Sequence, residues 1–226
     1  MSFQHSSTLI DPSIALSLVG MTEAAAISAS KFTGMGNKDL IDQAAVDAMR
    51  STLANIEIDG TVIIGEGEKD EAPMLFIGEI VGTGSGPKVD IAVDPIDGTT
   101  LLSKGMPGAL AAVALSPRNT MNCPTHISYM NKIAVGHEAR HSIDIDAPVL
   151  ENLCNIAKAK QKSIEDLVVV VLDRPRHKDL LSQIEKAGSK IKLIPDGDVA
   201  AGIQTALPLS LIHISEPTRL GMISYA

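Results

Sequence analysis

The stretch VDIAVDPIDGTT, residues Val89–Thr100, decides the fold of this chain. Its first five residues are largely apolar and predict a strand. Pro95 stiffens the exit from that strand, and Gly98 permits a tight turn directly after it. Asp94 and Asp97 are therefore expected at the carboxyl end of a strand, where open α/β sheets bind their ligands.

The two carboxylates of this stretch favour a metal site. Two such groups held close together repel each other, and a hard divalent cation between them removes that repulsion. Thr99 adds a hydroxyl that can orient a water molecule. A bare Asp-x-x-Asp pattern is more often a solvated loop, so the metal interpretation rests on the complete string Asp94–Thr99 after a strand.

A second acidic turn follows another predicted strand. Thr61–Ile64 is a short apolar run flanked by glycines, and the turn GEGEKD, residues Gly65–Asp70, comes directly after it. Glu66 is expected to point inward and to share a two-metal site with Asp94 and Asp97. An acidic turn on its own is usually only solvated, so that alternative stays open.

A third acidic segment opens a predicted helix at Asp39–Leu53. Asp39 is interpreted as the N-cap of this helix. Asp42 is expected in the first turn, where the helix dipole already favours an anion. A purely structural role for Asp42 therefore competes with a metal-binding one.

Two further segments follow predicted strands in the second half of the chain. Arg174–His177, RPRH, carries two guanidinium groups that suit a phosphate, although arginines at a helix start also occur on ordinary surfaces. His177 is interpreted as helix-capping or exposed rather than catalytic. Asp196–Asp198, DGD, either binds sugar hydroxyls or caps the following helix.

The chain as a whole alternates strand and helix patterns, which predicts an α/β protein with parallel strand–helix–strand units. Gly82–Pro87 is interpreted as a plain turn, and Pro73–Ile80 as strand or helix, with helix preferred at its start. The predicted helices are Ile14–Ser30, Asp39–Leu53, Leu150–Lys160, His177–Ala187 and Val199–Ala206, and the predicted strands are Thr61–Ile64, Val89–Val93, Ala109–Leu115, Leu167–Leu172 and Ile191–Ile194.

Composition limits the classes of function. With 19 Lys and Arg against 27 Asp and Glu, the formal net charge is −8, which argues against nucleic acid and anionic membranes as partners. The apolar runs are too short to span a bilayer, and the N-terminus lacks the basic region of a signal peptide. Two cysteines without metal-ligand spacing indicate a reducing, cytoplasmic setting.

The motifs, their order and their spacing resemble those of class II fructose-1,6-bisphosphatases over about residues 14 to 208. These motifs are Ile58–Thr61, Ile64–Glu68, Asp70–Leu75, Asp94–Thr100, Tyr129–Lys132, Arg174–His177 and Asp196–Ala200. The wider group of lithium-sensitive, metal-dependent phosphatases shares the Asp-Pro-Ile-Asp-Gly-Thr signature. The resemblance implies a layered αβαβα sandwich, here incomplete at the C-terminus.

The resemblance also implies a role for each site residue. The implied metal ligands are Asp42, Glu66, Asp94 and Asp97. The implied substrate contacts are Asp97, Gly98, Thr99, Tyr129, Arg174, Pro175, Arg176, Asp196, Gly197 and Asp198. The implied catalytic residues are Asp42, Thr99, Asp70 and Lys38.

The implied reaction is hydrolysis of the 1-phosphate of fructose 1,6-bisphosphate to fructose 6-phosphate and phosphate, a step of gluconeogenesis. Two Mn²⁺ or Mg²⁺ ions would activate a water molecule and stabilise the leaving oxygen. Family members are usually homo-oligomers. Sedoheptulose 1,7-bisphosphate is an alternative substrate, and the Arg-Pro-Arg segment disfavours an inositol-monophosphate-type phosphatase. A non-catalytic domain that binds metal or phosphate is the alternative of a different class.

The predicted organisation is an N-terminal metal-binding half at residues 1–145, a partial substrate-binding half at 146–208 and a non-native tail at 209–226. The last segment shows neither helical nor strand periodicity. It stands where family members continue with a further strand and a Gly-Gly-x-Pro-Glu-Gly motif, whose glutamate is a metal ligand. Without that glutamate, this chain is expected to be weakly active or inactive.

Overall fold

The computed structural model describes residues 11–65, 75–124, 129–207 and 212–219. These residues form two compact units that alternate along the chain. The first unit holds the described residues up to Ile96 together with Ala111–Pro124, and the second holds Asp97–Leu110 together with the described residues from Tyr129 on. The organisation expected from the sequence, with boundaries at residues 145 and 208, stays a prediction.

The first unit contains a four-stranded sheet of order β2-β1-β3-β4. Its strands are β1 (Asp59–Ile64), β2 (Ile80–Val81), β3 (Lys88–Asp97) and β4 (Leu110–Pro117). Strand β1 runs parallel to β3 and antiparallel to β2. The central strand β3 is buried over most of its length because Val, Ile and Ala side chains occupy both of its faces.

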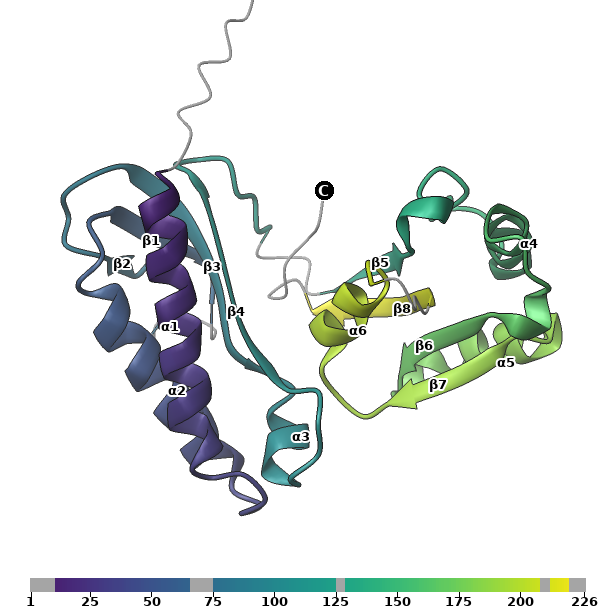
Figure 1. Cartoon of the computed structure of the whole chain (residues 1–226), viewed down its shortest axis with the longest axis horizontal. Helices are drawn as coiled ribbons and strands as arrows, with labels where there is room; N and C mark the ends of the chain where they lie inside the picture. Colours follow the sequence, from purple (N-terminus) through teal and green to yellow (C-terminus); the bar gives the residue numbers. More distant parts are fainter. Residues whose placement is uncertain (1–10, 66–74, 125–128, 208–211, 220–226) are drawn as a thin grey trace, which may run out of the picture. The chain divides into compact units, whose positions relative to one another are not determined.

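Two long helices, α1 (Pro12–Ser30) and α2 (Lys38–Leu53), pack against each other over one face of this sheet (Figure 1). The buried positions of α1 include Met21, Ala25 and Ala29, spaced by four residues as one helix face requires. Within the described ranges, α1 alone has the length and apolar composition to cross a membrane. Core helices and signal sequences pass the same test, so this is weak evidence.

The second unit contains a mixed sheet of order β5-β8-β6-β7. Its strands are β5 (Tyr129–Ala134), β6 (Val168–Leu172), β7 (Lys190–Ile194) and β8 (Ile212–Arg219). Strand β6 is parallel to both β7 and β8, whereas β5 is antiparallel to β8. The helices of this unit are α3 (Thr99–Ser103), α4 (Val149–Ala159), α5 (Lys178–Ala187) and α6 (Asp198–Gln204), with short 3₁₀ turns at His137–Ala139, Ile164–Asp166 and Pro175–His177.

The hydrophobic core of the second unit lies between its sheet and two of its helices. Strand β6 contributes Val169 and Val171, which are fully buried. Helices α4 and α5 contact each other and cover these side chains with residues at helical spacing, namely Leu153, Ile156, Leu180 and Ile184. This packing holds the carboxyl ends of β6 and β7 in fixed register.

The α/β class predicted from the sequence is confirmed, because each unit combines a sheet with helices. Each predicted helix and strand with a definite assignment is present at slightly different bounds. Gly82–Pro87 is a turn, since strand β3 begins at the next residue.

Two details of the prediction are wrong. The N-cap of α2 is Asn37 rather than Asp39, because the Asn37 Oδ1 atom accepts a hydrogen bond from the Leu40 N–H at 3.1 Å. Asp42 consequently lies just beyond the first turn of α2. The start of the segment Pro73–Ile80, where helix was preferred, lies outside the described residues; residues 75–79 form neither helix nor strand, and β2 begins at Ile80.

Candidate active site

Asp97 ends strand β3 and is the most buried of the predicted site carboxylates that the structure describes. Only 2% of the residue is exposed, and its Oδ2 atom accepts a hydrogen bond from the Val199 N–H at 3.0 Å. Burial comes first among the causes that raise the pKa of Asp97 to about 7, followed by the charge of Asp198; Asp196 adds to the shift, while the Val199 N–H opposes it. A nearby positive charge would therefore stabilise the ionised form of Asp97.

Asp196 lies in the loop between β7 and α6 and is bonded through both carboxylate oxygens. Its Oδ2 atom accepts a hydrogen bond from the Thr100 N–H at 3.1 Å. Its Oδ1 atom pairs with the Arg174 guanidinium at 3.3 Å. The segment Asp196–Asp198 was predicted either to bind sugar hydroxyls or to cap the following helix. Asp196 does not cap α6, because its hydrogen bond and its ion pair go to Thr100 and Arg174.

Lys132 on strand β5 interacts electrostatically with Asp97 and Asp198, and no individual role was predicted for it. It is half-buried, and burial lowers its pKa while the carboxylates of Asp198 and Asp97 act in the opposite direction. The signal that could have identified it is its place at the end of the Tyr129–Lys132 motif. Its ammonium offsets part of the negative charge around Asp97.

The Arg174–His177 segment divides into a buried and an exposed part. Pro175 and Arg176 are exposed, whereas His177 is fully buried, with its Nδ1 atom 2.6 Å from the Leu172 carbonyl oxygen. His177 was predicted to be helix-capping or exposed. It occupies the N-cap position of α5 but makes no capping hydrogen bond. Its ring instead ties the segment back to strand β6.

Further predicted site residues belong to other parts of the chain or begin strand β5. Lys38 is exposed at the start of α2, and Asp42 and Asp94 are half-buried on α2 and β3 of the first unit. Tyr129 begins strand β5 of the second unit. Glu66 and Asp70 lie outside the described residues.

A divalent metal fits the chemistry of the predicted ligands, all of which are carboxylates, since hard cations prefer oxygen donors. The crowding of Asp97 by two other carboxylates is an independent reason to expect a cation there. Among the residues that the structure describes, no three His, Cys, Asp or Glu side chains are placed to hold one ion. The ligand set Asp42, Glu66, Asp94 and Asp97 stays a prediction.

Replacing Asp97 with Asn is expected to stabilise the metal-free chain, and more at pH 8 than at pH 5. The folded-state pKa of about 7 exceeds the ordinary aspartate pKa of 3.8, so the folded chain binds a proton more tightly than the unfolded one. The contribution of the Asp97 carboxyl group to the free energy of unfolding therefore falls between about pH 4 and pH 7 and stays low above that range. Asn cannot ionise and still offers the Val199 N–H an oxygen.

The expected gain is on the order of 1–3 kcal/mol at pH 8, measured by urea unfolding in the presence of a chelator. The control is Asp179→Asn, which removes an exposed carboxylate at the start of α5 and shows the effect of losing a surface charge alone. A gain for Asp97→Asn that does not depend on pH would contradict the assignment.

The sequence matches the family described as bacterial fructose-1,6-bisphosphatase, glpX-encoded, over residues 12–216. This match spans both units of the structure and includes the Asp97 turn, the Arg174 segment and the Asp196 turn. The chain therefore belongs to this family of fructose-1,6-bisphosphatases.

Three individual proteins with this family's activity in their names are similar in sequence to this chain. They are fructose-1,6-bisphosphatase 1 class 2 of Escherichia coli strain K12 and the proteins named fructose-1,6-bisphosphatase class 2 of Escherichia coli O6:H1 and of Shigella flexneri. Each is 45% identical to this chain over 202 residues, which make up 89% of this chain and 60% of the relative. The chain thus spans about 60% of the length of these relatives.

Proposed function

We propose that this chain carries the site that hydrolyses the 1-phosphate of fructose 1,6-bisphosphate to fructose 6-phosphate and phosphate, in gluconeogenesis. The supporting observation is a group of site residues in the second unit of a chain that belongs to the bisphosphatase family. That group consists of Asp97, Lys132, Arg174, Asp196 and Asp198. It combines carboxylates for a cation with cationic groups for a phosphate.

Mn²⁺ or Mg²⁺ would be held by Asp42, Glu66, Asp94 and Asp97. When bound, these ions supply Lewis-acid activation of water and neutralise negative charge on the phosphate. The protein's own residues then orient the reactants. In this proposal Thr99, with Asp42 or Asp70, would orient the attacking water through hydrogen bonds, and Lys38 would serve as a cation for the reacting phosphate.

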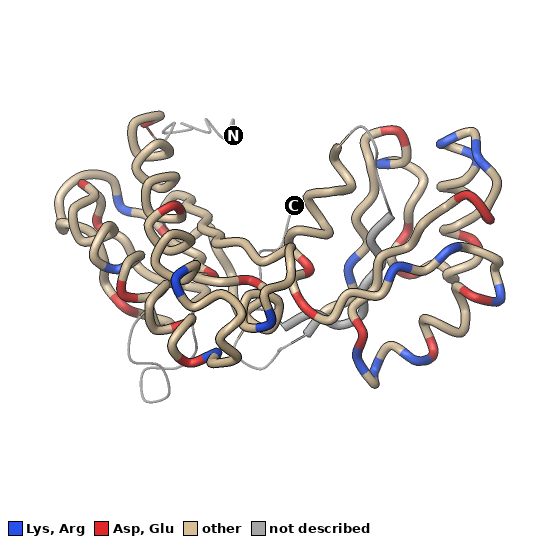
Figure 2. The backbone as a smooth tube through the Cα atoms, turned by 60° about the horizontal axis from the view of Figure 1, so that its bottom comes forward, with Lys and Arg blue, Asp and Glu red and all other residues tan. Residues whose placement is uncertain are grey.

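The sugar bisphosphate would contact Asp97, Gly98, Thr99, Tyr129, Arg174, Pro175, Arg176, Asp196, Gly197 and Asp198. Arg176 is exposed and suits the second phosphate, whose binding energy would position the first. The formal net charge is −8, with Asp and Glu interspersed among Lys and Arg along each unit (Figure 2). A local site, rather than the overall field, must therefore attract the anionic substrate.

The test is phosphate release from fructose 1,6-bisphosphate by the purified chain, with Mn²⁺ and with a chelator. We expect weak release with Mn²⁺, none with the chelator, and a rate at least about 100-fold lower in Asp97→Asn. Sedoheptulose 1,7-bisphosphate, assayed in parallel, decides which sugar is preferred.

Release that the chelator leaves unchanged would refute the metal-dependent mechanism. If no release is seen with either metal, calorimetry with fructose 1,6-bisphosphate separates the alternatives. Binding without turnover favours the non-catalytic domain. The expected location of the protein is the cytoplasm. The resemblance also implies a homo-oligomer, and sedimentation of the same preparation measures the oligomeric state.

A further inference from the structure

Two Asp-Gly turns of the second unit resemble each other in structure. Asp97 is the last residue of β3 and Gly98 follows it, whereas Asp196-Gly197 follows β7; each glycine is the N-cap of a short helix, α3 or α6. Both glycines have positive φ, 89° for Gly98 and 77° for Gly197. A Cβ atom added to Gly98 would lie 3.4 Å from the Cα atom of Gly197, so the two turns meet at their glycines.

Each turn caps the helix of the other turn. Thr100 and Val199 are the second residues of α3 and α6, and N–H groups at this position have no partner within their own helix. Asp196 accepts from the Thr100 N–H at 3.1 Å, and Asp97 accepts from the Val199 N–H at 3.0 Å. We call these two hydrogen bonds the crossed caps. They supply the side-chain acceptors that the glycine N-caps lack.

Arg174 anchors one side of the crossed caps. Its Nη2 atom pairs with Asp196 Oδ1 at 3.3 Å, and its Nη1 atom donates to the carbonyl oxygens of Pro195 at 2.6 Å and Asp173 at 3.1 Å. The guanidinium therefore joins the ends of β6 and β7. Since both oxygens of Asp196 are bonded, one to Arg174 and one to Thr100, its carboxylate is held in a single orientation.

We propose that Asp196 and Arg174 are positioning residues for the hydrolysis: through the crossed caps they hold the Asp97–Thr99 turn in the orientation that its carboxylate and hydroxyl need. This role rests on the proposed function and deepens it. Asp97 is bonded to the first turn of α6, which directly follows the loop that contains Asp196, so displacing either carboxylate loosens both turns. Small displacements of a reacting or ligating group are costly to rate, whereas substrate affinity depends on many other contacts.

The first measurement is amide hydrogen exchange of Thr100. In Asp196→Ala we expect the Thr100 N–H to exchange at least about tenfold faster, while Val170 in β6 keeps its protection. The matched control is Asp166→Ala, which removes an exposed carboxylate 3.9 Å from Lys190 of β7 and should leave Thr100 exchange unchanged. Asp196→Asn, which keeps an acceptor but loses the ion pair, should fall between the two and serves if Asp196→Ala does not fold.

The second measurement is steady-state kinetics of Mn²⁺-dependent phosphate release. Asp196→Ala and Arg174→Ala are expected to lower kcat by about tenfold to 100-fold, in addition to any rise in KM that comes from the lost substrate contacts. Unchanged Thr100 exchange in Asp196→Ala would overturn the crossed caps. Faster exchange with an unchanged kcat, or a change confined to KM, would overturn the positioning role.

Failure of the proposed function is distinguishable from failure of this inference. If the wild-type chain releases no phosphate, Mn²⁺ affinity measured by calorimetry takes the place of kcat. Mn²⁺ binding about tenfold weaker in Asp196→Ala than in wild type then supports the positioning of Asp97, and equal affinity overturns it.

Discussion

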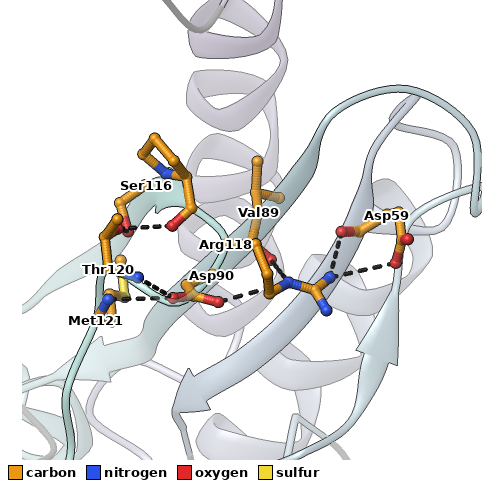
Figure 3. A network of polar contacts seen from close by, with 8 residues as sticks. Asp59, Val89, Asp90, Ser116, Arg118, Thr120 and Met121 are labelled. Atoms are coloured by element: carbon orange, nitrogen blue, oxygen red, sulfur yellow. Dashed lines mark hydrogen bonds and ion pairs between the residues drawn. The ribbon is translucent and has the colours of Figure 1, made fainter. Parts of the chain in front are cut away.

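The variant Asp90→Ala is expected to lose about 3–5 kcal/mol of its free energy of unfolding. Asp90 lies on β3 and is fully buried. Its Oδ2 atom accepts from the N–H groups of Thr120 at 2.9 Å and Met121 at 3.1 Å, and its Oδ1 atom lies 3.5 Å from Nε of Arg118 (Figure 3). Alanine leaves two buried backbone donors without their acceptor and removes the carboxylate that offsets the Arg118 charge.

The matched control uses the second carboxylate of the same network. Asp59 also pairs with Arg118, at 3.2 Å, but 28% of its side chain is exposed (Figure 3). Solvent screens this pair, so Asp59→Ala should cost less than about 1 kcal/mol. Urea unfolding without metal measures both variants. Equal losses, or a loss below about 1 kcal/mol for Asp90→Ala, would show that burial does not decide the strength of this network.

The variant Gly82→Ala is expected to lose about 3 kcal/mol or more. Gly82 has a φ of 90°, and a Cβ added to it would lie 2.4 Å from the carbonyl oxygen of Ile58. That oxygen also accepts a hydrogen bond from the Gly84 N–H at 3.0 Å, so it cannot move away without breaking the turn before β3. Backbone strain and overlap therefore add together.

Gly84→Ala separates these two contributions within the same turn. Gly84 has a φ of 77°, but a Cβ there would meet nothing within 4 Å. Only the backbone strain remains, and the expected loss is about 1–2 kcal/mol. Thermal or urea unfolding of the two variants side by side gives the comparison. A Gly84→Ala loss as large as that of Gly82→Ala would mean that positive φ alone explains both.

Local patterns predicted the helices and the buried strands well because their signals lie within a few residues of each other. Apolar spacing marks α2 and α5, and the apolar run Leu167–Leu172 marks β6. Strands β5 and β8 carried no such signal. They pair with each other, Tyr129 opposite Arg219, across a separation in sequence that no local pattern records.

The short helix α3 was missed for a related reason. Its N-cap is a left-handed glycine, and a helix of five residues is too short to show a period. The N-cap of α2 was misplaced by two residues, since Asn and Asp are nearly equivalent caps and only the hydrogen bond to Leu40 distinguishes them.

The sequence by itself determined the family and the α/β class and supplied the candidate site residues, because these depend on residue types in a fixed order. It did not determine the bonds of those residues. Asp97 and Val199 are 102 positions apart, and Asp196 and Thr100 are 96 apart, so their pairing exists only after the turns have come together. The raised pKa of Asp97 likewise arises from burial and from Asp198, which lies far away in the chain. Hydrogen-bond partners and local electrostatics depend on distances in space, and only the tertiary structure sets those distances.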